Sequence, residues 1–145
     1  MRVATILPVF AVVLLATGCG SSTLSHKDYV QQANEICSAY NKQVKGLVQP
    51  TSVTEIESYA RKVLERYRTA LAQLEALKPP KDDAVTVNQW LSTDRRIAKD
   101  VAAIADAAQA RRLPAVESAT DQARIHNTAS DRLARELGLT ACAKG

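Results

Sequence analysis

The sequence predicts an all-α fold, an up-down-up-down bundle of four helices that follows a cleaved N-terminal signal peptide. Glycine and proline, which interrupt helices, are sparse after residue 25 and leave long segments between them. Within each segment apolar residues recur at steps of three and four, the spacing of one helix face. Short connections make successive helices antiparallel neighbours. The interrupting positions are Gly46, Pro50, Pro79, Pro80, Pro114 and Gly138.

The first helix is expected over residues 27–48. Ser25 can cap it, with Asp28 three residues on in an arrangement similar to a capping box. Because Cys37 lies on the apolar face, its thiol should point into the bundle. That face comprises Val30, Ala33, Cys37, Tyr40, Val44 and Leu47.

The second helix, expected over residues 53–78, has the strongest periodicity in the chain. Ser52 and Glu55 form a candidate capping box, and Pro79-Pro80 ends the helix. Its apolar stripe is unbroken and comprises Val53, Ile56, Ala60, Val63, Tyr67, Ala70, Leu74 and Leu77.

The third and fourth helices are expected over residues 84–111 and 114–137. Asp82 or Asp83 can cap the third, Pro114 suits the first position of the fourth, and Gly138 suits its end. Polar residues interrupt both apolar stripes: Asp94 in the third helix, and His126 and Ser130 in the fourth. The third stripe comprises Val87, Trp90, Ile97, Val101, Ile104 and Ala108.

The N-terminus has the layout of a secretory signal. Arg2 precedes an apolar run over residues 3–16, which is shorter than the roughly 20 residues that span a bilayer as a helix. The segment Leu15-Ala16-Thr17-Gly18-Cys19 resembles the lipobox of bacterial lipoproteins, although such motifs most often carry leucine where Ala16 stands. The alternative is an ordinary secretory signal with a chance cysteine.

The resemblance implies a diacylglycerol-modified, acylated Cys19 and cleavage between Gly18 and Cys19. Residues 1–18 would then be the signal peptide, 19–25 a short lipid-anchored linker and 26–145 the helical domain. Removing 18 of 145 residues leaves 127, enough for one domain with a hydrophobic core. The residues after Cys19 extend at most about 17 Å, so the domain should lie close to the outward-facing surface of the cell membrane.

Two cysteines remain once Cys19 is lipidated. In an exported domain Cys37 and Cys142 predict one disulfide, and the alternatives are two free thiols or a metal pair. His26 and His126 are the only histidines and there is no Cys-x-x-Cys spacing, which disfavours a metal. We therefore expect the C-terminal tail to turn back along the first helix to reach Cys37.

The placement of the cysteines carries a second resemblance. Residues 33–37, with the sequence Ala-Asn-Glu-Ile-Cys, and Gly138-Leu139 followed by Cys142 resemble small actinobacterial lipoproteins of uncharacterised function. This similarity implies an extracytoplasmic helical domain with one disulfide, and it implies no activity.

Helix register places four polar residues at one level: Asn34, Arg66, Asp94 and Ser130. They form a candidate polar layer, either a small pocket with a ligand-contacting carboxylate or a structural charge pair between Asp94 and Arg66, which we favour. His126, near the level of Lys99, is expected at the core boundary, and Asn34 and Asn41 are expected in solvent.

Charge and motifs narrow the function. The net charge of +4 is mildly basic and falls to +3 without Arg2, and an exported protein rarely meets nucleic acid. No phosphate loop, nucleophile elbow or metalloprotease motif is present, so we expect neither an enzyme nor a cofactor. We expect a lipid-anchored module that binds an envelope protein. The alternative is a small-ligand carrier with a pocket between its helices. An exposed apolar strip would favour the first hypothesis, and an apolar cavity the second.

Overall fold

The computed structural model describes residues 23–143 and confirms the four-helix fold. The helices are α1 (His26–Lys45), α2 (Val53–Ala76), α3 (Ala84–Gln109) and α4 (Leu113–Glu136). The signal peptide and Cys19 lie outside the described residues. Within residues 23–143 no helix is both long and apolar enough to cross a membrane.

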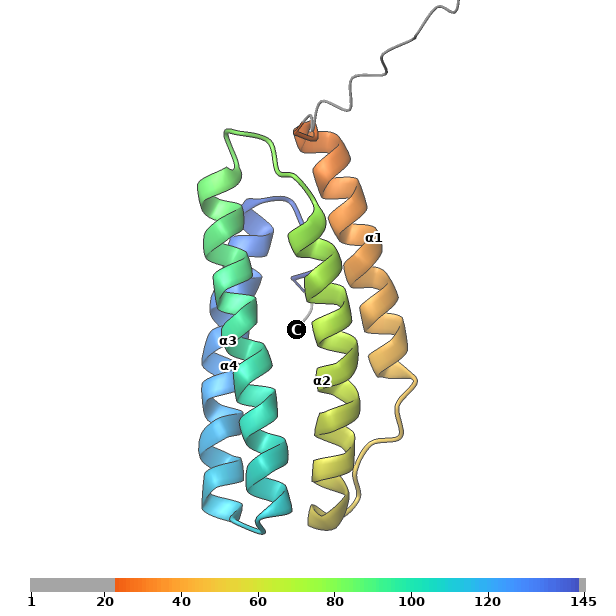
Figure 1. The fold of residues 1–145 in the computed structure, drawn as a ribbon, viewed down its shortest axis with the longest axis vertical. Helices are drawn as coiled ribbons and strands as arrows, with labels where there is room; N and C mark the ends of the chain where they lie inside the picture. The colour runs from red at the N-terminus through yellow and green to blue at the C-terminus, as the bar shows by residue number, and fades with distance from the viewer. Residues whose placement is uncertain (1–22, 144–145) are drawn as a thin grey trace, which may run out of the picture.

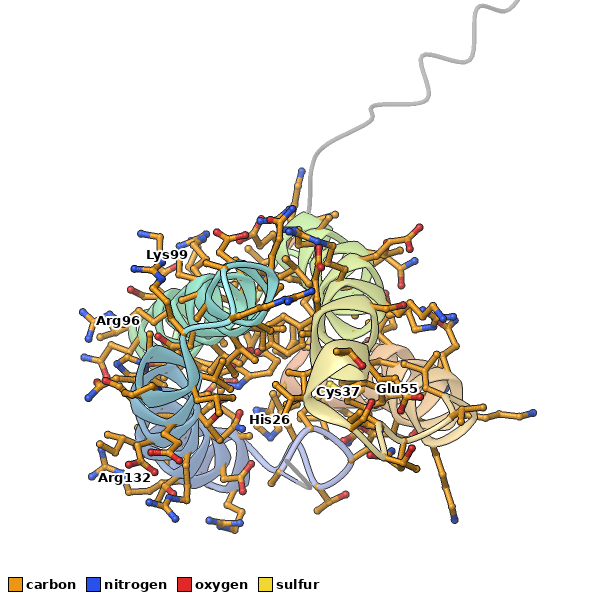
Figure 2. The ribbon with its side chains drawn as sticks, turned by 90° about the horizontal axis from the view of Figure 1, so that it is seen from below. His26, Cys37, Glu55, Arg96, Lys99 and Arg132 are labelled. Atoms are coloured by element: carbon orange, nitrogen blue, oxygen red, sulfur yellow. A yellow bond between two sulfur atoms is a disulfide. The ribbon has the colours of Figure 1, made fainter. Side chains whose placement is uncertain are left out.

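The helices pack in chain order, and the side between α1 and α4 is closed differently from the rest. Close backbone contacts join α1 to α2, α2 to α3, and α3 to α4, whereas α1 has none with α3 or α4. The C-terminal tail, residues 137–143, crosses from the upper end of α4 toward α1 and turns down between them (Figure 1). Seen along the bundle axis, this tail bridges the two helices (Figure 2).

Gly138 turns the chain out of α4. Its φ of 76° lies in the left-handed region that favours glycine. The N–H of Leu139 donates to the Ala134 carbonyl at 2.8 Å, and the N–H of Gly138 donates to the Arg135 carbonyl at 3.1 Å. These two bonds make a Schellman motif, in which the fully buried Leu139 follows the turn. The predicted stop at Gly138 is confirmed.

The tail is fixed to α1 by one covalent and two polar contacts. Cys37 and Cys142 form the predicted disulfide, with Cα atoms 5.1 Å apart and a sequence separation of 105. Asn34 Oδ1 accepts from the N–H of Ala141, and Asn41 Nδ2 donates to its carbonyl, both at 2.8 Å. The expectation that both asparagines are solvated is therefore wrong. By the chain-entropy model, a disulfide that closes a loop of this length stabilises the fold by up to about 4–5 kcal/mol.

Each helix starts within one residue of its predicted position, but the predicted side-chain caps of α2 and α3 do not form. Ser25 caps α1 as predicted, because its Oγ accepts from the N–H of Asp28 at 3.2 Å. At α2, however, Glu55 accepts from the N–H and hydroxyl of Thr51, at 2.7 and 3.0 Å, and Ser52 makes no side-chain cap. At α3 the Asp83 carboxylate does not cap the helix, since it binds His26 Nδ1 at 2.6 Å.

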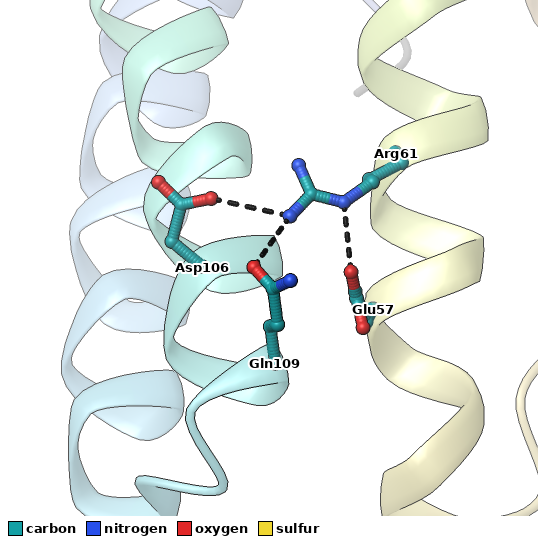
Figure 3. A network of polar contacts seen from close by, with 4 residues as sticks. All are labelled: Glu57, Arg61, Asp106 and Gln109. Carbon is teal, nitrogen blue, oxygen red and sulfur yellow. Dashed lines mark hydrogen bonds and ion pairs between the residues drawn. The ribbon is translucent and has the colours of Figure 1, made fainter.

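The lower ends of α2 and α3 are linked by a surface network centred on Arg61 (Figure 3). Its Nε donates to Glu57 on the same helix at 2.9 Å, and its Nη2 donates to Gln109 of α3 at 3.0 Å and lies 3.4 Å from Asp106. The Arg61 side chain is nearly half exposed, so this network contributes little to stability.

Candidate functional site

The buried core contains two clusters at different heights. The upper cluster joins all four helices and the tail around Tyr29, Trp90 and Leu139, each no more than 1% exposed. The lower cluster joins α3 and α4 through Ala107, Ala108 and Val116, with Ile56 of α2 packed against it. One cavity borders the upper cluster, and the two share Cys37, Leu71, Leu74 and Trp90.

This cavity has a volume of about 550 Å³ and is lined from every helix. Most of its wall is apolar, and α2 and α3 supply most of that apolar part. Its presence follows from the position of α1, which approaches α2 alone and leaves room in front of α3 and α4. The apolar lining includes Val44, Val63, Ala70, Ile97 and Val101.

The cavity explains an apparent excess of apolar residues on α2. Val63, Tyr67 and Ala70 belong to the predicted stripe, yet they are only half-buried. They face the cavity, whereas Leu64, outside that stripe, is buried and does not line it. The stripe therefore marks the cavity wall of α2 in addition to its core contacts.

A chain of buried hydrogen bonds reaches the wall of the cavity. Trp90 Nε1–H donates to the Ser130 hydroxyl at 3.0 Å, and that hydroxyl donates to Asp94 Oδ1 at 2.5 Å. All three residues line the cavity, and Asp94 is only 5% exposed. The chain joins α3 to α4 and fixes the Asp94 carboxylate against the hollow.

The Asp94 carboxylate is held in an unfavourable place for a charge. Burial raises its pKa to about 6, with hydrogen bonds from Ser130 and Tyr67 opposing that shift and the charge of Asp131 adding to it. Burial likewise raises the pKa of Tyr40 to about 12, and burial and then the charge of Asp94 raise the pKa of Tyr67. The tyrosines therefore remain neutral at physiological pH, beside an acid whose pKa is about 6.

Aromatic side chains form the wall between α1 and α2. The rings of Tyr40 and Tyr67 meet edge to face, with centroids 5.4 Å apart and planes at 74°. Trp90 contributes a third aromatic residue to the same lining, from α3. Three aromatic residues and one buried carboxylate thus share one hollow.

The predicted polar layer is half right. Asp94 and Ser130 meet as expected, but Arg66 donates from Nη1 to the Lys62 carbonyl at 2.9 Å and forms no ion pair with Asp94. Asn34 is occupied by the tail at Ala141. The predicted charge pair fails because Arg66 binds its own helix, whereas the tail runs along α1 to Cys37 as predicted.

The remaining lining residues are polar and lie near solvent. Asn41 and the exposed Lys45 come from α1, and Asn127 and Asp131 come from α4. Asp131 lies 3.9 Å from Arg135, a loose contact. These four residues come from α1 and α4, which make no close backbone contact with each other.

The two histidines lie away from the cavity, each beside an aspartate. His126 Nδ1 lies 2.6 Å from Asp100 Oδ2 between α4 and α3, a partly buried contact that confirms the boundary position but with Asp100 as the neighbour in place of Lys99. Among the described residues, no group of three or more His, Cys, Asp or Glu side chains could hold a metal ion.

Comparison with known proteins yields no relative. No protein-family model matches the chain, and neither the curated proteins nor the solved structures contain a match. The case for a function comes from the geometry of the cavity.

Proposed function

We propose that this domain is a non-enzymatic carrier that binds a small, mainly apolar molecule in the cavity between its helices. One observation carries the proposal: an apolar hollow of about 550 Å³ with a few converging polar groups. Ligand sites in proteins typically have this size and this composition. Removing apolar surface of the ligand from water would supply the main driving force for binding.

The distribution of exposed apolar side chains favours a carrier over a module that docks on an envelope protein. In the described part of the chain the large exposed hydrophobic residues come from the connection after α1 and from α2, α3 and α4. No two of them are three or four residues apart, so they do not make a strip along one helix. They are Val48, Val53, Val85, Leu113 and Ile125.

We further propose that lipid on Cys19 holds the carrier at the outer surface of the cell membrane. Support comes from the lipobox-like sequence and from Leu24, whose N–H donates to the Lys78 carbonyl at 2.9 Å. Because Leu24 is fixed at the upper end of the bundle, only residues 19–23 separate that end from the anchor, at most about 17 Å. A Cys19→Ser variant should move from the membrane fraction to the soluble fraction, and its retention in the membrane would contradict the anchor.

The carrier function is testable with the one tryptophan of the chain. Trp90 lines the cavity, so its fluorescence should report a ligand such as the neutral dye N-phenylnaphthylamine. Ala70→Phe fills the cavity from α2, and Ala72→Phe places the same ring on the exposed side of that helix. We expect saturable binding that Ala70→Phe weakens at least about tenfold, or about 1.4 kcal/mol. Equal binding by both variants, or no saturable binding at all, would refute the cavity as the site.

A further inference from the structure

We propose that the preferred ligand is an organic ammonium ion, an apolar body whose positive charge lies against Asp94 and the aromatic residues of the cavity. This inference rests on the proposed carrier function and specifies the class of molecule carried. It follows from the charge, the burial and the neighbours of Asp94.

The first argument is the missing counter-ion. Asp94 is 5% exposed, and no Lys, Arg or His side chain in residues 23–143 lies within 4.0 Å of its carboxylate. Its hydrogen-bond donors, Ser130 and Tyr67, are neutral. A buried carboxylate without a cation is unfavourable, and a bound ammonium group would relieve that cost.

The second argument is the overall charge of the lining. Asp94 from α3 and Asp131 from α4 are the two acids that line the cavity, and Lys45 from α1 is its one base. Lys45 is exposed, and α2 supplies no charged lining residue. With both acids ionised, two acids against one base give the lining a net negative charge, which favours a cation and disfavours a carboxylate or phosphate ligand.

The third argument is the aromatic wall. Tyr40, Tyr67 and Trp90 line the same hollow as Asp94, one each from α1, α2 and α3. Aromatic rings attract cations electrostatically, and grouped rings recognise quaternary ammonium ligands in proteins. A carboxylate beside three aromatic residues suits such a group better than it suits a neutral alcohol or an uncharged hydrocarbon.

The test compares two ligands of the same shape. Benzyltrimethylammonium and neopentylbenzene share one skeleton, with a charged nitrogen in the first where the second has a carbon. Titration calorimetry at about pH 8, where Asp94 is ionised, gives both affinities for the wild type, Asp94→Asn and Asp82→Asn. Asp82 lies exposed before α3 and does not line the cavity, so Asp82→Asn removes the same charge elsewhere.

We expect the wild type, but not Asp94→Asn, to prefer the cation over its uncharged isostere. The wild type and Asp82→Asn should bind the cation at least about tenfold more tightly than the isostere, or about 1.4 kcal/mol. Asp94→Asn should lose this preference while still binding neopentylbenzene, which also shows that its cavity is intact. If the isostere binds the wild type as tightly as the cation, or Asp94→Asn keeps the preference, the ammonium assignment is wrong and the carrier function stands. Binding of neither ligand would overturn both proposals.

Discussion

Asn34 and Asn41 lie two turns apart on α1 and bind the N–H and the carbonyl of a single residue, Ala141. Both hydrogen bonds measure 2.8 Å and are partly buried. Together with the adjacent disulfide, they hold the tail between α1 and α4. These two helices make no close backbone contact with each other. The tail thereby holds α1 in position, and this position leaves room for the cavity.

Asn34→Ala should loosen the tail without unfolding the helices. It leaves the partly buried N–H of Ala141 without its partner, which should lower the free energy of unfolding by about 1 kcal/mol. Urea denaturation measures this loss, and hydrogen exchange should show faster exchange at the Ala141 amide. The control is Gln32→Ala on the exposed side of the same helix. An unchanged Ala141 exchange rate would show that Asn34 does not hold the tail.

The sequence was sufficient to predict the helices and their order, because each signal was local. Periodicity placed the apolar faces, and the Pro79-Pro80 pair and Gly138 marked two helix ends. The predicted caps at Ser52 and Asp83 are wrong because other contacts form there: Glu55 binds Thr51, and Asp83 binds His26. No local rule indicates that Glu55 binds Thr51, or that Asp83 binds a histidine 57 residues away.

Gly138→Ala should destabilise the fold through the backbone, not through a clash. An added Cβ would meet only Val30 at 3.9 Å, an ordinary contact, but the φ of 76° is unfavourable for alanine. We expect a loss of about 1 kcal/mol in chemical denaturation. Gly46→Ala is the matched control, because Gly46 has a φ of −79° and alanine should be neutral or slightly stabilising there. Equal effects of the two substitutions would rule out backbone conformation as the cause.

Asp94 should make the protein less stable as pH rises from about 4 to about 7. Its pKa is raised to about 6 in the folded state, so the folded protein binds a proton in this range that the unfolded chain has released. The shift from 3.8 corresponds to about 3 kcal/mol, present below pH 3.8 and lost as pH rises through 6. Asp94→Asn should therefore be the more stable protein at neutral pH, with its advantage vanishing near pH 4. Urea titrations across this range measure the difference, and a less stable variant at neutral pH contradicts the account.

Tyr29→Phe should leave the fold as stable or more stable. The Tyr29 side chain is 1% exposed, and its hydroxyl has no hydrogen-bond partner among the described residues. Burying an unpaired hydroxyl costs about 1–3 kcal/mol, so its removal should raise the thermal midpoint. Tyr59→Phe serves as the control, because the Tyr59 hydroxyl accepts an exposed hydrogen bond from Gln49. A large loss of stability for Tyr29→Phe alone would mean that its hydroxyl has a partner.

The candidate site was only partly predictable. Asp94 and Ser130 interrupt two apolar stripes at one level, and that coincidence indicated their contact correctly. Trp90 was predicted in the core, but its donation to Ser130 depends on side-chain geometry that periodicity does not contain. The cavity itself arises from the distance between α1 and α4, which the inserted tail determines. A pattern within single helices carries no information about that distance.

The most direct test of the carrier account is to locate a bound ligand by methyl NMR. Titrating protein labelled at Ile, Leu and Val methyl groups with neopentylbenzene should shift the cavity residues Val44, Val63, Ile97 and Val101 in one saturable process. The exposed Val48, Val85 and Ile125 should not move, and they act as internal controls. Shifts confined to the exposed methyl groups, or an absence of saturable shifts at the cavity, would contradict the central claim.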